Sequence, residues 1–481
     1  LIRRFGTALR LSRRGARGYA VGRRVLKARR MNREDGMYPR TTKGWCAACR
    51  AVVPAEIVEE SGALVFHLNC PECGELASVV EHDAELYKRW ETARRPNRPP
   101  EAAQTAPGRG CPLDCGLCPN HRQKSCVALI EVTTACDLGC PVCFADSGGG
   151  GAHRPLDEIE FMLDACVRAA NGKPDIVQIS GGEPACHPQL LDILRAAKAR
   201  PFKYVMLNTN GLAIADGRLS CADLKSVGLG FEVHLQFDGM DDAAHTALRG
   251  RPLLARKLAA LDRLAEHGIP VTLVATLRNG VNMDGLGGLL RFALDHPAVR
   301  GLNLQCEARF GRNDTRPGAE RVTQTQTVRA LERQAPELLT AEDFLPLSCG
   351  LASLAYLERV DGAWRPLPPA LAGVIPGNPM TTSIEDLHAL AAEMCACRGA
   401  ALLAEVAGRL PANLLDMDRE ARSRLVQERF FHVTVISFLD ADNFDLDRAC
   451  RECTHVVQPD GRKIPFSAFN TIHRESGHAP A

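Results

Sequence analysis

The stretch Thr134-Ala-Cys136-Asp-Leu-Gly-Cys140-Pro-Val-Cys143-Phe144-Ala-Asp146 holds three cysteines in C-x3-C-x2-C spacing. It closes an apolar segment, residues 127–134, that reads as a buried strand. Three thiolates on one short loop can bind three irons of a cubane iron–sulfur cluster, which leaves the fourth iron without a protein ligand. An iron of this kind can bind a small molecule. Zinc is the alternative, but zinc prefers four ligands in two pairs. We therefore predict a 4Fe–4S cluster at these three cysteines.

Charge and cysteine content divide the chain of 481 residues unevenly. Residues 1–30 carry ten Arg and one Lys and no acid, so the other 451 residues hold 48 basic and 57 acidic side chains. We expect residues 1–40 to be a disordered basic arm, whose composition also suits anionic lipid, nucleic acid or a transit sequence. The chain has no apolar run of membrane-spanning length. Eleven of its 20 cysteines form tight groups before residue 144, which favours bound metal and a reducing, cytoplasmic compartment over disulfides.

Two pairs of cysteines, Cys46–Cys49 and Cys70–Cys73, define a small module over residues 41–95. Each pair has C-x2-C spacing, and the sequence between the pairs is β-rich. Two such loops facing each other form a tetrahedral site for zinc or a single iron. Because so small a module cannot bury a sufficient core, we expect its folding to depend on the ion. The second pair lies in a Cys-Pro-Glu-Cys-Gly run that resembles a rubredoxin or zinc-ribbon loop.

A second group of cysteines, Cys111, Cys115, Cys118 and Cys126, lies in the segment 96–126. Four thiolates can complete an auxiliary 4Fe–4S cluster, which passes electrons but has no open iron. A second zinc site is the alternative.

Residues 127–320 alternate apolar strand-like runs with amphipathic helical stretches, which predicts a parallel sheet covered by helices. The expected strands are 127–134, 175–180, 203–208, 232–237, 271–277 and 301–307. Six such units make an incomplete (β/α)6 barrel with its chemistry at the carboxyl ends of the strands. Polar residues such as His234, Gln236 and Asp238 alternate with apolar ones, so we expect them to face the barrel interior. They must bind a polar ligand, water or one another.

The three-cysteine loop resembles the signature of the radical S-adenosylmethionine (SAM) superfamily. That resemblance places Phe144 near the adenine of SAM. It also assigns Gly181, Gly182 and Glu183, in the run Ser180-Gly-Gly-Glu-Pro184, to the methionine part of SAM. It implies further SAM contacts at Asn208, Asn210, Gln236 and Arg249. In this family the reduced cluster cleaves SAM into methionine and a 5′-deoxyadenosyl radical, which removes hydrogen from an unactivated carbon.

The stretch 44–146 and the C-terminal run Arg451-Glu-Cys453-Thr-His455 resemble the tetraether lipid synthase family. Members carry extra iron–sulfur clusters and a rubredoxin-like site, and relatives have been linked to methylation of a pterin precursor. The resemblance implies a second auxiliary cluster in a C-terminal α+β domain over residues 321–481. Its expected ligands include Cys349, Cys450 and Cys453, with Cys395 and Cys397 as an extra pair. This chain has Ser353 and Ser467 where we expect further cysteines, so the presence of this cluster stays open.

We expect an enzyme that generates a deoxyadenosyl radical and attacks an inert C–H bond, with C–C coupling of lipid alkyl chains as the first hypothesis. The second is a radical methylase or maturase for a pterin-like or peptide substrate. The third is a multi-metal electron-transfer protein without catalysis. A long apolar groove would favour lipid, and a short polar cavity a pterin. The expected partners are SAM, a substrate and a reductant such as flavodoxin or ferredoxin. Peripheral membrane contact through the arm is also open, and we expect no nucleic acid.

Overall fold

A computed structural model describes residues 38–94, 96–313, 320–368 and 427–474, together with positions 418, 421 and 425. Most of the basic arm, as well as Cys395 and Cys397, therefore lies outside the described residues. The N-terminal module is an antiparallel sheet of four strands followed by a helix. These are β1 (Arg40–Cys46), β2 (Ala51–Glu60), β3 (Ala63–Cys70), β4 (Gly74–Glu81) and α2 (Ala84–Ala93). The Asp83 side chain caps α2 by accepting a hydrogen bond from Leu86 N.

Six parallel strands form the barrel, and adjacent strands in the chain are neighbours in the sheet. They are β5 (Val127–Glu131), β6 (Ile176–Ser180), β7 (Tyr204–Thr209), β8 (Phe231–Gln236), β9 (Val271–Leu277) and β10 (Val299–Cys306). The helices between them are α3 (Leu156–Ala169), α4 (Leu190–Lys198), α5 (Leu212–Ala215), α6 (Cys221–Ser226), α7 (Asp242–Arg249), α8 (Leu254–Glu266) and α9 (Leu286–Asp295). The predicted partial (β/α)6 barrel is thus confirmed, with each strand within a few residues of its expected position.

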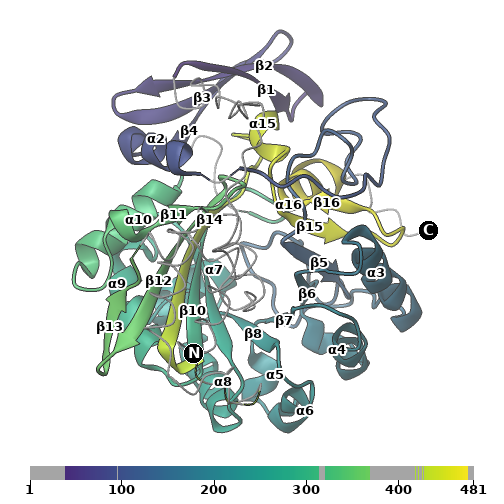
Figure 1. Cartoon of the computed structure of the whole chain (residues 1–481), viewed down its shortest axis with the longest axis vertical. Coiled ribbons are helices and arrows are strands. Elements are labelled where there is room, and N and C mark those ends of the chain that lie inside the picture. Colours follow the sequence, from purple (N-terminus) through teal and green to yellow (C-terminus); the bar gives the residue numbers. More distant parts are fainter. Residues whose placement is uncertain are drawn as a thin grey trace, which may run out of the picture.

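Strands from the C-terminal region extend this sheet at both edges, giving 12 strands among the described residues. On one side β14 (Phe430–Ser437) pairs in parallel with β10, and β12 (Ala352–Val360) pairs antiparallel with β14. On the other side β15 (Thr454–Val457) pairs in parallel with β5. The remaining described α-helices and β-strands are α10 (Gln324–Gln334), β11 (Leu345–Pro346), β13 (Ala363–Pro366), α15 (Leu446–Ala449), β16 (Lys463–Pro465) and α16 (Phe466–Ala468). One sheet therefore contains strands from both sides of residue 320, the predicted boundary between the barrel and the C-terminal domain. In Figure 1 the yellow helix α15 lies beside the N-terminal module, whereas the yellow strand β14 lies within the barrel sheet.

Side chains of the barrel strands alternate between the helices and the interior. Val233, Leu235 and Phe237 are fully buried in the main apolar core. The residues between them face inward, since Gln178 Nε2 on β6 contacts Asn208 Oδ1 on β7 at 2.6 Å and His234 Nδ1 on β8 at 3.1 Å. The expected polar interior is present, and its groups bind one another. Among the described residues, no helix combines the length and the apolar character needed to cross a membrane.

Candidate metal centres and active site

The two cysteine pairs of the N-terminal module meet at one point. Cys46 ends β1 and Cys49 follows it, while Cys70 ends β3 and Cys73 precedes β4. The four Sγ atoms all lie within 4.8 Å of one another, and Cys49 Sγ is 3.5 Å from Cys70 Sγ. Four thiols at this separation fit one tetrahedral ion. The metal site predicted from the spacing is therefore confirmed in its geometry.

Cys46→Ser is expected to release about one metal ion per chain, because three thiolates bind a tetrahedral ion more weakly than four. The small module should then melt at a lower temperature, since its fold depends on the ion. Metal analysis and thermal unfolding followed by circular dichroism would measure both effects. We expect SAM cleavage to persist in this variant. Loss of cleavage without loss of the barrel would show that the module takes part in catalysis.

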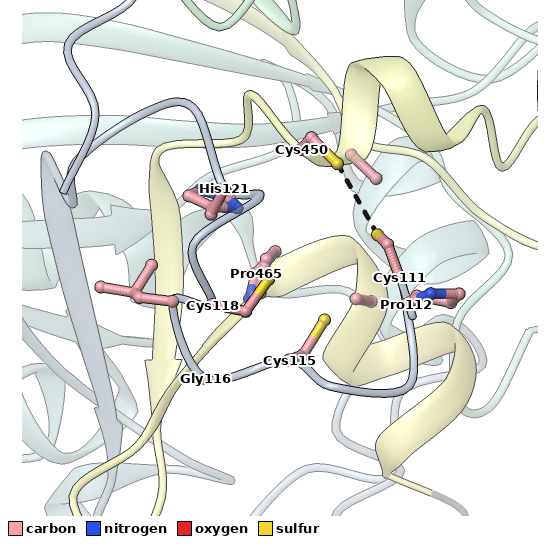
Figure 2. A pocket seen from close by; sticks show the side chains of 11 residues that line it. Cys111, Pro112, Cys115, Gly116, Cys118, His121, Cys450 and Pro465 are labelled. Carbon is pink, nitrogen blue, oxygen red and sulfur yellow. Dashed lines mark hydrogen bonds between the residues drawn. The ribbon is translucent and has the colours of Figure 1, made fainter. Parts of the chain in front are cut away.

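A second group of thiols surrounds a small cavity between the 111–118 loop and the C-terminal segment (Figure 2). Cys111, Cys115 and Cys118 line this cavity together with Cys450, whose Sγ lies 3.7 Å from that of Cys111. We expected Cys126 to complete this set. The structure instead joins Cys126 to Cys453 through the backbone, since Cys126 N and Val127 N donate to Cys453 O at 2.9 and 3.3 Å. The exchange arises because β15 pairs with β5, which brings the 450–453 turn beside both groups.

The three-cysteine loop follows β5 at the carboxyl end of the barrel, where two arginines hold its backbone. Arg312 donates from Nε to Cys140 O at 2.6 Å and from Nη2 to Ser147 O at 2.7 Å. Arg249 Nη1 donates to Val142 O at 3.3 Å. These bonds leave the three thiols unconstrained by backbone partners, apart from one N–H that Leu138 donates to Cys136 Sγ. The arginines fix the loop without occupying the positions that a cluster needs.

The two glycines of the Gly-Gly-Glu run allow the β6 loop to lie directly on the cysteine loop. A Cβ atom on Gly181 would lie 2.3 Å from Thr133 O, and one on Gly182 would lie 2.3 Å from Ala135 O. Gly182 N and Glu183 N donate to these same two carbonyls, each at 2.8 Å. The family resemblance assigns both glycines to the methionine part of SAM. Their close contact in the structure is with the segment that leads into Cys136.

The side chains expected to contact SAM all have protein partners. Glu183 is buried, and its carboxylate accepts from Thr209 Oγ1 and Asn210 N, both at 2.7 Å. Burial raises the pKa of this carboxyl. Asn210 Nδ2 donates to Asp137 in the cysteine loop at 2.7 Å, and Asn208 bonds to Gln178 and Ser180. Phe144 packs on Phe466 with ring centroids 5.3 Å apart. Contact of these groups with SAM therefore stays a prediction, and their observed role is to bind the strand ends to the loop.

A buried ion network below the loop was missed from the sequence. Arg249 pairs with both carboxylate oxygens of Asp238 at 2.7 Å. Lys257 on α8 is fully buried, and its Nζ donates to Gln236 Oε1 at 2.7 Å and to the carbonyl of Asn210. Burial raises the pKa of the Cys140 thiol, and the positive charges of Arg249 and Lys257 oppose this rise. A lysine in an amphipathic helix is normally exposed. The only signal in the sequence that Lys257 points inward is its position on the apolar face of the helix.

Lys257→Met is expected to flatten the pH dependence of stability in the metal-free chain. Burial lowers the pKa of Lys257 to about 7, well below its usual value near 10.4. Between these values the unfolded chain binds a proton that the folded chain lacks, so the free energy of unfolding rises with pH. Denaturant unfolding at several pH values from about 7 to 10 would measure the difference between wild type and variant. Lys225→Met, at an exposed position of α6, should leave the slope unchanged.

The cysteine loop fits an iron–sulfur cluster with one open iron. It offers three partly buried thiols, cationic side chains close by, and, among the described residues, no fourth thiol within its own segment. A cluster at these thiols leaves one iron available to chelate SAM. The sequence favours a structural core position for Cys166, Cys186, Cys221 and Cys306. Cys166, Cys221 and Cys306 are buried in the core, whereas Cys186 is only partly buried.

Comparison with known proteins supports the same chemistry. The family model described as "Radical SAM superfamily" matches residues 130–293, and that described as "HMPTM N-terminal zinc ribbon domain" matches residues 38–82. The chain is 31% identical to the 7,8-dihydro-6-hydroxymethylpterin dimethyltransferase of Methanocaldococcus jannaschii, over 90% of this chain and 94% of that protein. It is 29% identical to the GTP 3′,8-cyclase of Synechococcus elongatus, over 38% of this chain and 55% of that one.

Among solved structures, SuiB of Streptococcus suis bound to its precursor peptide SuiA matches with a TM-score of 0.38 and 17% identity. The match covers 45% of this chain and 47% of SuiB. The extent of the similarity to the Methanocaldococcus enzyme, together with the cysteine loop and the zinc ribbon, establishes the family. The chain is a radical SAM enzyme and belongs to the family of the 7,8-dihydro-6-hydroxymethylpterin dimethyltransferase.

Proposed function

We propose that this enzyme functionalises a C–H bond of a small polar heterocycle of the pterin type, as a radical methylase or related transferase. The three-thiol loop at the carboxyl end of a parallel barrel carries the radical part of this proposal. The similarity to an enzyme named for a dihydropterin over nearly the whole chain supports the substrate class. Lipid C–C coupling, our first hypothesis from the sequence, has no comparable support in these comparisons.

The charge of the barrel mouth also favours a polar substrate. Arg278, at the end of β9, pairs with both oxygens of Glu307, which follows β10, at 2.6 and 2.7 Å. Beside them Arg309 and Arg321 pair with Asp442 and Asp440 after β14. Ion pairs at the carboxyl ends of three adjacent strands can exchange partners with a ligand's amides and ring nitrogens. An alkyl chain offers these charged groups no hydrogen-bonding partner.

Each part of the chain has a distinct task in this proposal. The cluster, when bound, supplies one electron to SAM and thereby the 5′-deoxyadenosyl radical. Arg312 and Arg249 hold the cysteine loop, and the Gly181–Gly182 contact fixes the loop against β6. The Asp238–Arg249–Lys257 network gives the interior a fixed charge pattern that orients polar ligands.

Deuterium transfer into 5′-deoxyadenosine would test the substrate class. Anaerobically reconstituted enzyme, SAM and dithionite would be incubated with carbon-deuterated 7,8-dihydro-6-hydroxymethylpterin, and separately with a deuterated archaeal-type diether lipid. We expect deuterium in 5′-deoxyadenosine, or a mass gain of one methyl group on the substrate, with the pterin alone. Label arising only from the lipid would refute the pterin class but not radical chemistry. No 5′-deoxyadenosine under any condition would refute both.

A further inference from the structure

Inside the barrel, side chains near the middle of the strands are partly exposed, whereas their neighbours on the outer face are buried. On β10 Asn303 is partly exposed between buried Leu302 and Leu304, and on β14 Thr434 is partly exposed next to buried Val433. The partly exposed inward positions of the other strands are Gln178, Asn208, Gln236, Val274 and Thr276. Partial exposure requires space beside a side chain. The barrel interior is therefore not filled by its own side chains.

Two walls of this interior differ in their hydrogen bonding. On the wall formed by β6, β7 and β8, the Gln178 side chain bonds to both Asn208 and His234. On the wall formed by β10 and β14, Asn303 Oδ1 is buried and has no hydrogen-bond partner among the described residues. Buried polar atoms are normally paired, and leaving one without a partner is costly. The second wall therefore offers polar groups that a bound molecule can satisfy.

Strand pairing fixes where Asn303 lies relative to the cysteine loop. Asn303 is opposite Thr434 in the parallel pair of β10 and β14. β10 ends three residues later, at Cys306, so Asn303 lies about 10 Å before the carboxyl end of the strand. The segment after β10 reaches the cysteine loop, where Cys143 N donates to Arg312 O at 2.8 Å. A molecule bound at Asn303 can thus extend along the interior toward this loop.

The chemistry of the Asn303 side chain matches one edge of a pterin-type ring. A carboxamide presents an acceptor, Oδ1, beside a donor, Nδ2–H. A lactam presents the complementary N–H and carbonyl oxygen, so two parallel hydrogen bonds can form, as they do between asparagine and adenine. The Thr434 hydroxyl can accept from an amino group next to the lactam. In a pterin the lactam edge lies at the opposite end of the bicyclic ring from the pyrazine carbons.

We propose that Asn303 determines substrate specificity by binding the lactam edge of the heterocycle, with Thr434 beside it. This orientation directs the pyrazine carbons toward the barrel mouth, where the three-cysteine loop lies. The inference rests on the proposed function for the class of substrate. It adds the residue that recognises the ring and the direction in which the ring binds. Binding of this kind forms only hydrogen bonds and breaks no covalent bond.

Equilibrium binding tests this role without radical chemistry. The full-length reconstituted enzyme would be loaded with SAM, without reductant, and titrated with 7,8-dihydro-6-hydroxymethylpterin. A second titration would use the analogue that has hydrogen in place of the lactam oxygen. We expect the wild type to bind the pterin about 10- to 100-fold more tightly than the analogue. Asn303→Leu should bind both compounds equally. Asn303→Ala, which cannot crowd the interior, should give the same result.

Val274→Ala is the matched control for these variants. Val274 is the partly exposed neighbour of Asn303 on β9, and its side chain has no polar group. Its truncation should change both affinities by a similar factor and keep the preference for the pterin. Iron analysis and circular dichroism would verify that each variant is folded and loaded.

The outcomes separate this inference from the proposed function. A preference for the pterin that both Asn303 variants retain would overturn the role of Asn303 and leave the proposed function intact. The same holds if the wild type binds pterin and analogue equally. A wild-type enzyme that binds no pterin would contradict the proposed function and, with it, this inference.

Discussion

Cys140→Ala is expected to abolish formation of 5′-deoxyadenosine and to lower the iron content by about four per chain. Two thiolates cannot hold the cubane that SAM must reach. The loop itself should keep its position, because Arg312 binds the backbone carbonyl of Cys140 and not its side chain. The bonds from Arg249 to Val142 and from Asn210 to Asp137 likewise do not involve the thiol. Chromatography of reactions with SAM and dithionite would measure the loss directly.

Cys166→Ala is the matched control for this variant. Cys166 is a buried cysteine on α3, and the charged groups that act on its thiol are Lys463 and Arg168. Its removal should cost stability through a small cavity, while iron content and 5′-deoxyadenosine formation stay at wild-type levels. If Cys140→Ala retained cleavage at the level of this control, the cluster would not be bound by the Cys136–Cys143 loop.

Local sequence patterns predicted the parts of the molecule that depend on neighbours in the chain. The Cys136–Cys143 loop, the two C-x2-C pairs and the six barrel strands were all located from spacing and periodicity. Each of these features depends on residues that are close together in the sequence. A cluster-binding loop needs three cysteines at short spacing, and a buried parallel strand needs apolar residues on the face that meets the helices. For the zinc ribbon, the prediction also had to bring together Cys49 and Cys70, which are farther apart in the sequence. The β-rich sequence between them predicted the strands that do so.

The grouping of the auxiliary thiols was not predictable in this way. Cys126 is eight residues from Cys118 and more than three hundred from Cys453, so proximity in sequence favoured the first set. The structure reverses this because β15 joins the edge of the barrel sheet beside β5. The same pairing brings Cys450 to Cys111 at 3.7 Å. Which strands pair at the edges of a sheet determines these contacts, and that pairing produces no periodic pattern in a single sequence.

The polar barrel residues illustrate a different limit. Their alternation correctly placed Asn208, Gln236 and Asp238 on the interior face, but not their partners. Asn208 binds Gln178, and Gln236 binds Lys257 and Asp238. Buried polar groups must be paired, and a sequence does not tell whether the partner is a ligand or another side chain. The cations that complete these pairs, Arg249 and Lys257, lie on helices α7 and α8, outside the strands that gave the pattern.

Gly182→Ala is expected to remove both the cluster and SAM cleavage although it changes none of the three cysteines proposed to bind the cluster. The new Cβ would lie 2.3 Å from Ala135 O and 3.0 Å from the Cβ of Ser147. Backbone cannot yield as a flexible side chain does, so the β6 loop and the cysteine loop must separate. That separation breaks the bonds from Gly182 N to Thr133 O and from Glu183 N to Ala135 O, each 2.8 Å long. Overpacking of this kind costs about 1–3 kcal/mol. Here the clash displaces Ala135, the residue directly before Cys136.

Gly288→Ala separates this effect from a general cost of replacing glycine. Gly288 is exposed in α9, and no atom outside its own helix would lie within 4 Å of a new Cβ. Alanine should stabilise that helix by up to about 1 kcal/mol and leave the iron content unchanged. Iron analysis, thermal unfolding and 5′-deoxyadenosine assays would be run on both variants. A Gly182→Ala protein that keeps wild-type iron and cleavage would show that the close contact between the two loops does not position the cluster.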